Sequence, residues 1–167
     1  MKKSTPAIII VSLIIVLPIA WYLISPLWHK QVVNDVSPLS VTPPTTTTGT
    51  TTPISGTVPA QAQAQIVAQG SLIPKAHDVA GQALLIQDAV GKQILRFENF
   101  QSTDGPDVHV YLSADYDARD AVELGRLKAT SGNVNYDVPA GVDSKKYNKV
   151  LIWCRPFHVL FSATELK

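Results

Sequence analysis

The chain has 167 residues, enough for one ordinary domain with appended segments, and its formal net charge is +1. A charge so near zero provides no surplus of basic side chains for nucleic acid, so we expect no nucleic-acid partner. The hydrophobic fraction of 46% is raised by one apolar block near the start, so the average composition describes neither end of the chain.

The first element is this apolar block, which runs from Thr5 to Trp28 without a charged side chain. A helix that rises 1.5 Å per residue over this length crosses a hydrocarbon core about 30 Å thick. We therefore predict a tail over residues 1–6 and a transmembrane anchor over 7–28 that contacts membrane lipid. The alternative is a cleaved signal peptide with a basic start, but the run exceeds the usual signal length and no Ala-x-Ala site follows it.

The orientation of the anchor follows from its flanking charges. Lys2, Lys3 and the free amino group precede the anchor, and only Lys30 follows it closely. Because basic residues favour the cytoplasmic side, we predict a single-pass protein of the cell membrane. Its N-terminus is cytoplasmic and its C-terminal domain is extracytoplasmic.

The segment 29–65 is predicted to be a disordered Thr/Pro-rich stalk. Between Ser37 and Pro59 it combines runs of threonine with four prolines and almost no large apolar side chains. Such a composition cannot bury enough surface to offset chain entropy. It is typical either of an O-glycosylated spacer or of an unglycosylated linker, and we expect a protease that cuts there to release the domain.

Residues 66–167 form the predicted folded domain. Short apolar runs recur about every ten residues between Gly, Pro, Asn and Asp, and no long stretch repeats at 3.6 residues. This pattern indicates an all-β fold, a small antiparallel β-sandwich or barrel of about eight short strands. The expected strands are Ile66–Ile73, Gln82–Gln87, Gln93–Glu98, Val108–Ser113, Leu124–Thr130, Val134–Val138, Lys149–Cys154 and Phe157–Ser162.

Four connections carry turn signals. Asp88–Gly91 and Ser131–Asn133 are predicted turns between strands, because they contain residues that accept positive φ. Asp104–Asp107 is a predicted tight turn in which Gly105 supplies backbone freedom. Asp143 is expected to begin one helical turn that reaches Tyr147.

Alternation along the strands predicts which side chains are inside. Val108, Val110 and Leu112 share the inward face, and His109, Tyr111 and Ser113 share the opposite one. Val150, Ile152 and Cys154 share one face, as do Phe157, Val159, Phe161 and Ala163, but the two sets have opposite parity. We expect an irregularity at Pro156 to restore the inward phase, which places Cys154 inside and close to Phe157.

Several ordered motifs in the last hundred residues resemble one known family, the extracellular DM13 domain. They are Phe97–Phe100, Gly105–Ser113, Leu124–Lys128, Gly132–Pro139, Tyr147, Ile152–Cys154, Phe157 with Phe161, and His77 ahead of Gly81. The resemblance implies a DM13-like domain over 66–167. DM13 domains occur in surface proteins, sometimes beside cytochrome-binding modules and b-type membrane cytochromes, and have been proposed to transfer electrons through their one cysteine.

The resemblance therefore assigns the redox role to Cys154, with a redox partner protein on the other side of the exchange. From the residues alone, two alternatives remain open for this lone cysteine. It is either an inert thiol that packs as a small apolar residue or a reactive group. Arg155, the residue after Cys154, is expected to point to the opposite face, away from the thiol.

The other candidate ligands are His77, His109 and His158. A copper or haem centre would require Cys154 and one or two of these histidines to converge, because such centres use thiolate and imidazole. Nothing in their spacing requires it, and His109 is expected to face away from Cys154. The acidic loop Asp115–Glu123 resembles a calcium loop only superficially, since Arg119 occupies a ligand position and no Gly follows.

The sequence contains no enzyme signature, such as a phosphate-binding glycine loop, a paired metal-binding histidine motif or a nucleophile elbow. Two hypotheses of different kinds follow. The domain is either a membrane-anchored redox or electron-transfer module that uses Cys154, or a non-catalytic surface module that binds a partner or a surface polymer and keeps Cys154 as a structural residue.

Overall fold

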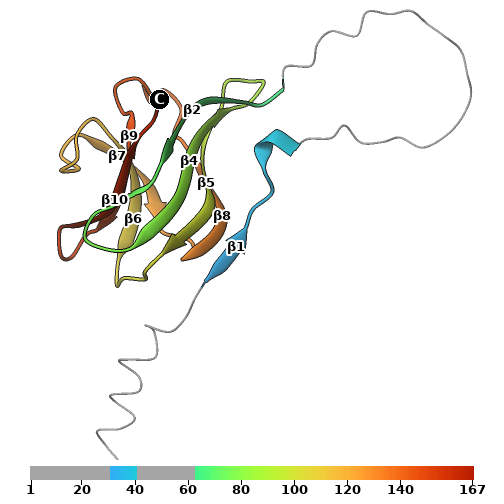
Figure 1. Cartoon of the computed structure of the whole chain (residues 1–167). Coiled ribbons are helices and arrows are strands. Elements are labelled where there is room, and N and C mark those ends of the chain that lie inside the picture. The colour runs from blue at the N-terminus through green and yellow to red at the C-terminus, as the bar shows by residue number, and fades with distance from the viewer. Residues whose placement is uncertain (1–30, 41–62) are drawn as a thin grey trace, which may run out of the picture. The chain divides into compact units, whose positions relative to one another are not determined.

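The computed structural model describes residues 31–40 and 63–167 (Figure 1). The predicted tail 1–6, the anchor 7–28 and residues 41–62 of the predicted stalk lie outside the described residues. Within the described ranges, no helix has the length and apolar character needed to cross a membrane.

The described strands form two five-stranded sheets packed face to face, with the core between them. The all-β prediction is confirmed, and the architecture is a two-sheet sandwich. The first sheet has the order β1 (Val32–Asn34), β8 (Ser131–Asp137), β5 (Gln93–Ser102), β4 (Val79–Gln87) and β2 (Gln65–Ser71). The second has the order β3 (Ile73–Pro74), β10 (Val159–Glu165), β9 (Lys149–Cys154), β6 (Val108–Ser113) and β7 (Ala121–Arg126).

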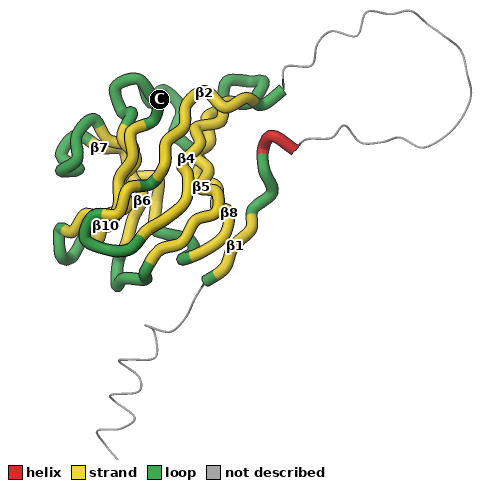
Figure 2. Tube along the Cα trace, in the orientation of Figure 1, coloured by secondary structure: helices red, strands yellow, loops and turns green. Residues whose placement is uncertain are grey.

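Pairing is antiparallel except between β1 and β8, which run parallel. Figure 2 shows strands joined by loops throughout residues 63–167. The helical element of the described chain is the single turn η2, a 3-10 turn over Pro38–Ser40. Short strands with close turns therefore account for the domain, as the ten-residue periodicity predicted.

Most predicted strands are present, with shifted ends. β6 and β9 have the predicted bounds, and β4 and β5 are longer than predicted. The predicted strand Ile66–Ile73 is divided at Leu72 into β2 and β3, which belong to different sheets. Leu72 is buried and its N–H donates to the carbonyl of Gly81 at 2.9 Å, so the chain crosses between the sheets at this residue.

The predicted turn at Ser131–Asn133 is wrong, because these residues begin β8. A hairpin turn there would require β7 and β8 to be neighbours, and they lie in different sheets. Gly132 does have a positive φ of 109°. It uses this conformation beside the irregularity in the pairing of β5 with β8, between Phe97 and Phe100.

The prediction for the last hairpin is also wrong in part. Phe157 is 67% exposed in the turn between β9 and β10, and no irregularity is needed at Pro156. Cys154 pairs directly with Val159 across a four-residue turn, and antiparallel pairing joins positions of opposite parity. The irregularity lies instead between Leu160 and Ser162.

That irregularity changes which residues of β10 point inward. Phe161 belongs to the core, as predicted, but Ala163 lies opposite Leu151, whose side of β9 faces away from the core. The predicted inward position of Ala163 is therefore wrong. Ala163 and Leu151 are nonetheless buried.

The core receives side chains from both sheets. Val108, Val110 and Leu112 are buried in it, as predicted. The largest of its fully buried side chains form an aromatic group in which Phe97 stacks on Phe100 at 5.0 Å between ring centroids and meets Tyr136 edge-on at 5.6 Å. The Tyr136 hydroxyl accepts a hydrogen bond from the Lys128 N–H, and burial raises the pKa of Tyr136 to about 12.

Two of the predicted turns are confirmed. Asp88 caps the β4–β5 hairpin by accepting hydrogen bonds from the N–H groups of Val90 and Lys92 through Oδ1. The Tyr147 N–H donates to the Asp143 carbonyl at 2.9 Å, which closes the predicted helical turn.

Gly105 has a different role from the predicted one. It does not have a positive φ. A Cβ atom at this position would lie 2.6 Å from Cγ2 of Val108 and 3.1 Å from Cζ of Phe161. Glycine is therefore needed for close packing and not for conformational freedom.

The start of the domain also differs from the prediction. Residues 31–40, assigned to the stalk from the sequence, contribute β1 and η2. Val33 packs against the core. The sandwich therefore includes a strand that precedes the Thr/Pro-rich residues 41–62.

Candidate functional site

Cys154 is the last residue of β9 and is 1% exposed. Its direct partners on the neighbouring strands are Val108 of β6 and Val159 of β10. Because directly paired residues share a face, the thiol lies among aliphatic side chains on the core side of the sheet. The predicted inward position of Cys154 is confirmed.

The next residue back, Trp153, lies on the other face of the same strand. It pairs with His109 of β6 and with Leu160 of β10. His109 therefore points away from Cys154, as predicted from alternation, but it is only 7% exposed.

Both ring nitrogens of His109 contact carboxylates. Nε2 lies 2.8 Å from Oδ1 of Asp107, and Nδ1 lies 2.6 Å from Oε1 of Glu123. A neutral imidazole carries one N–H and can donate to only one of them, whereas the protonated ring donates to both. The tautomer of a neutral ring therefore decides which carboxylate accepts its hydrogen bond.

Arg155 closes these contacts into a ring. Its Nε lies 2.9 Å from Oδ2 of Asp107, and its Nη1 lies 3.5 Å from Oε2 of Glu123. We call the four residues Asp107, His109, Glu123 and Arg155 the His109 cluster. Hydrogen bonds from His109 and then from Arg155 hold the pKa of Asp107 below its ordinary value of 3.8.

Local backbone features bring this cluster together. The pairing of β6 with β7 shifts between Val110 and Tyr111, next to Gly125, whose φ is 118°. Val110 pairs with Gly125. The shift then places Glu123 opposite Tyr111, the residue after Val110. The backbone N–H of Arg155 donates to the Asp107 carbonyl at 3.1 Å, which fixes the start of the turn after β9 beside β6.

The remaining predicted ligands lie elsewhere. The His77 ring is 3.9 Å from the Phe161 ring, between centroids, in the connection from β3 to β4. His158 lies in the exposed turn before β10 with a φ of 51°. Across the described ranges 31–40 and 63–167, no three His, Cys, Asp or Glu side chains are grouped to hold a metal ion. The structure therefore does not bring the histidines and Cys154 into a haem or copper site.

A shallow groove lies on the outer face of the second sheet, around Trp153. It consists of two hollows of about 450 and 220 Å³ that share Asp117, Trp153 and His158. Lys75, Tyr116 and Leu160 complete the first, and Tyr111, Ala118 and Arg155 complete the second. We call this feature the Trp153 groove, and it combines aromatic rings with charged groups of both signs.

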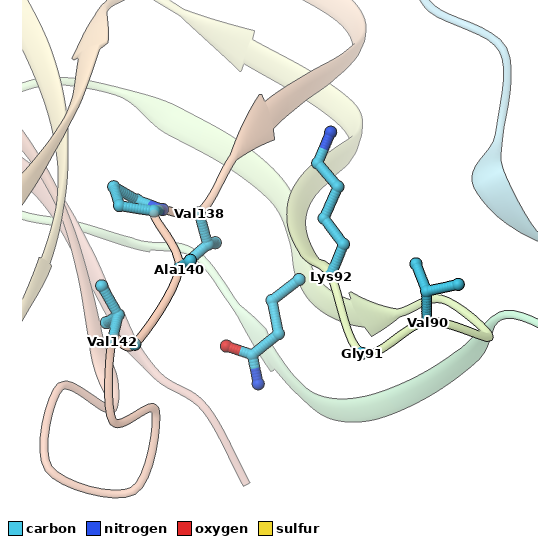
Figure 3. Close-up of a pocket in the computed structure, with 9 residues that line it drawn as sticks. Val90, Gly91, Lys92, Val138, Ala140 and Val142 are labelled. Carbon is cyan, nitrogen blue, oxygen red and sulfur yellow. The ribbon is translucent and has the colours of Figure 1, made fainter.

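Another hollow, of about 520 Å³, lies between the β4–β5 turn and the loop after β8 (Figure 3). Its lining combines aliphatic side chains such as Val90, Val138 and Val142 with polar groups such as Lys92. The loop after β8 leads to the first residue of β9, whereas Cys154 is the last. This hollow is therefore separate from the end of the sheet that holds the thiol.

The acidic loop Asp115–Glu123 is organised by hydrogen bonds within the protein. Asp115 accepts backbone N–H groups from Asp117, Arg119 and Asp120, while Asp120 pairs with Lys146 at 2.8 Å. Glu123 belongs to the His109 cluster. Asp115 and Asp120 of this loop are therefore engaged by hydrogen bonds and an ion pair within the protein.

The His109 cluster could not be predicted from the sequence. From the sequence, His109 was one of three candidate ligands, Glu123 belonged to the acidic loop, and Arg155 was expected only to point away from the thiol. The available signal was that Asp107, the residue directly before β6, and His109 within it are two positions apart, so their side chains can lie on the same side. Their connection to Glu123 and Arg155 depends on the pairing of β6 with β7 and β9.

Together these features define a two-sheet β domain with one buried thiol and an ion cluster on the opposite face of the same strands. Residues 71–166, more than half of the chain, match the family described as Electron transfer DM13. The chain therefore belongs to the DM13 family. Neither a curated protein nor a solved structure matches it significantly.

Proposed function

We propose that this protein is a membrane-anchored, extracytoplasmic electron-transfer module in which Cys154 is the redox group. Membership of the electron-transfer DM13 family supports the redox-related part of this proposal and is the observation that carries it. The lone cysteine supports the choice of residue, since it is the redox-active side chain best suited to a domain whose described residues do not form a metal site. The anchor over 7–28 and the orientation rest on the sequence.

The chemistry of one exchange can be written for the thiol alone. Cys154 loses one electron to a one-electron acceptor on a partner protein and one proton to water admitted by transient opening of the exposed turn 155–158, which leaves a thiyl radical. Return of an electron and a proton restores the thiol. The aliphatic surroundings of Cys154 keep larger reactants such as other thiols from reaching it, so the oxidised form is protected from reaction with them.

The Trp153 groove is the best-placed docking surface for such a partner. Trp153 precedes Cys154 in the chain and lines both hollows of the groove. A partner bound there would lie one residue from the thiol along the backbone. Its aromatic and charged lining suits a protein surface of mixed polarity.

The experiment compares electron exchange by purified full-length variants with a one-electron oxidant such as ferricyanide. The wild-type chain is expected to reduce ferricyanide, and a folded Cys154→Ser chain is expected not to. Val108→Ala is the matched control, because it removes volume beside the thiol but keeps the thiol itself. Equal exchange by wild type and folded Cys154→Ser would contradict the assignment of Cys154.

A second candidate function is a non-catalytic surface module that binds a partner or polymer. The observation that favours it is that Cys154 is only 1% exposed. The Trp153 groove, which Tyr111 and Tyr116 also line, is open to a partner instead. Under this alternative the thiol is a structural residue and the groove is the functional surface. Trp153→Ala would then abolish partner binding, while Cys154→Ser would leave it intact in the folded protein.

A further inference from the structure

The edge of the first sheet is completed by a strand that lies outside the region matched to the family. β1 pairs in parallel with β8, in the register Val32 to Ser131, Val33 to Gly132 and Asn34 to Asn133. Figure 1 shows β1 along the free side of β8. The family match begins at residue 71, so β1 lies outside it, as does most of β2.

The backbone of β8 is shaped for this neighbour. An added Cβ at Gly132 would collide with the carbonyl oxygen of Val33. The positive φ of Gly132 therefore coincides with the closest approach of β1. Glycine at this position permits both the irregularity in β8 and the contact with the added strand.

Side chains of the sandwich bind the backbone of the segment at both ends. At its start, the Gln31 N–H donates to Oγ1 of Thr130 at 3.1 Å, and the Gln31 carbonyl accepts the Thr130 N–H at 2.9 Å. At its end, the Asn135 amide donates to the Val36 carbonyl at 2.9 Å. Six residues, Gln31–Val36, are thus held along their whole length.

Asp35 makes the densest set of contacts. Its N–H donates to the Asn133 carbonyl at 2.8 Å, and its Oδ2 accepts the Asn135 N–H at 2.8 Å. Its carbonyl accepts Nη1 of Arg96 at 3.1 Å. Arg96 is only 4% exposed, so loss of the segment would uncover a guanidinium that is otherwise satisfied by protein groups.

The position of this segment in the chain has a topological consequence. It comes before residues 41–62, whereas β2 begins after them at Gln65. β1 and β2 are the two opposite edges of the first sheet. Residues 41–62 therefore connect two strands of one domain, and the chain before residue 31 meets the sandwich at β1.

We propose that Gln31–Val36 is a noncovalent attachment site that holds the sandwich to the preceding part of the chain even when residues 41–62 are cut. The occupant of the β8 edge is the chain's own segment. If residues 7–28 anchor the chain, the sandwich is held at the membrane by β1, and the Thr/Pro-rich residues do not act as its spacer. The proposal is independent of the redox role of Cys154.

The test uses the full-length chain with an affinity tag at the N-terminus and an epitope at the C-terminus. Residues 46–52 are replaced by the recognition sequence of a specific protease. After complete cleavage, the N-terminal part is captured under native conditions, and the C-terminal fragment that remains bound is quantified. Most of the fragment is expected to remain bound in native buffer and to be released in urea.

Two proline variants separate β1 pairing from other contacts. Asp35→Pro removes the N–H that donates to Asn133 and the carboxylate that binds Asn135, and retention is expected to fall at least tenfold. Val32→Pro is the matched control, and its retention is expected to be unchanged. Gln31 and Asp35 form hydrogen bonds to β8 and to the residue before it. Because hydrogen bonding alternates along an edge strand, the N–H of Val32 is expected to point away from β8. If Asp35→Pro impairs folding, Asn135→Ala is the second variant, with partial release expected.

Two results would overturn the proposal. One is complete release of the wild-type fragment on cleavage, to the same extent as in Asp35→Pro. The other is capture of the fragment by a second, differently tagged copy mixed in before cleavage, which would show that β1 pairs between chains. Failure of the ferricyanide experiment would change neither the retention of the fragment nor its capture by a second copy. The attachment by β1 is therefore tested independently of the redox role of Cys154.

Discussion

The two faces of the paired strands β6 and β9 have opposite chemistry although they share one backbone. On the inner face, Cys154 lies between Val108 and Val159 in an aliphatic core. On the outer face, one residue away on each strand, His109 lies between two carboxylates. Alternation at a period of two therefore places a dry thiol and an ion cluster on opposite sides of one sheet.

This difference determines how each face can act. The inner face is closed to solvent, so its thiol is expected to react slowly with reagents that must reach it, and under the proposed function it exchanges electrons without direct contact. The outer face is accessible through the Trp153 groove, so it is suited to docking. The comparison predicts that changes to the inner face act on stability and redox behaviour, and that changes to the outer face act on pH dependence and binding.

The largest expected effect on stability comes from filling the inner face. Gly105→Val would place side-chain atoms where Val108 and Phe161 already lie, so we expect a loss of about 2–3 kcal/mol in the free energy of unfolding. Urea denaturation measures it. Ala140→Val, on an exposed loop, is the control with little change, and a Gly105→Val chain as stable as wild type would mean that the core is looser here than described.

A smaller loss is expected when the inner thiol becomes a hydroxyl. Cys154→Ser buries a polar group between Val108 and Val159, with an expected cost of about 1–2 kcal/mol. The same burial predicts that thiol reagents modify native Cys154 at least tenfold more slowly than the denatured chain. Equal labelling rates in the two states would remove the distinction between the faces.

The smallest effect concerns the outer face and appears in the pH dependence. Because its contacts with His109 and Arg155 lower the pKa of Asp107 in the folded state, Asp107 contributes stability above pH 3.8, and that stability is lost as the pH falls through the lower folded value. Asp107→Asn should therefore be less stable than wild type near neutral pH, with the difference shrinking in acid below about pH 3.8. A difference that is constant with pH would show that Asp107 does not act through its charge.

Local patterns predicted much of this arrangement. The alternation in β6 was sufficient to place Val108 and His109 on opposite faces, and the parity of β9 placed Cys154 inside. Each of these inferences depends only on neighbours along one strand, whose side chains must alternate whatever the sheet order. The turns at Asp88 and Asp143 were predicted for the same reason, since their hydrogen bonds are local.

Features that depend on distant residues were not predicted. The role of Gly132 depends on β1, which lies about a hundred residues earlier in the sequence, so a glycine between Ser131 and Asn133 resembled a turn. The His109 cluster requires β7 and β9 to flank β6 in one register. Phe157 was placed inside because an apolar residue in phase with Val159 was read as part of the strand, whereas the four-residue turn leaves it in solvent.

The central claim is that the thiol of the inner face exchanges electrons, and a stoichiometric titration of the purified full-length chain with ferricyanide tests it most directly. We predict that each chain gives up one electron to ferricyanide, that alkylation of Cys154 after denaturation is lost in the oxidised form, and that a mild reductant restores it. A folded wild-type chain that consumes no ferricyanide while Cys154 remains fully alkylatable would contradict the claim and leave the thiol as a structural residue of the core.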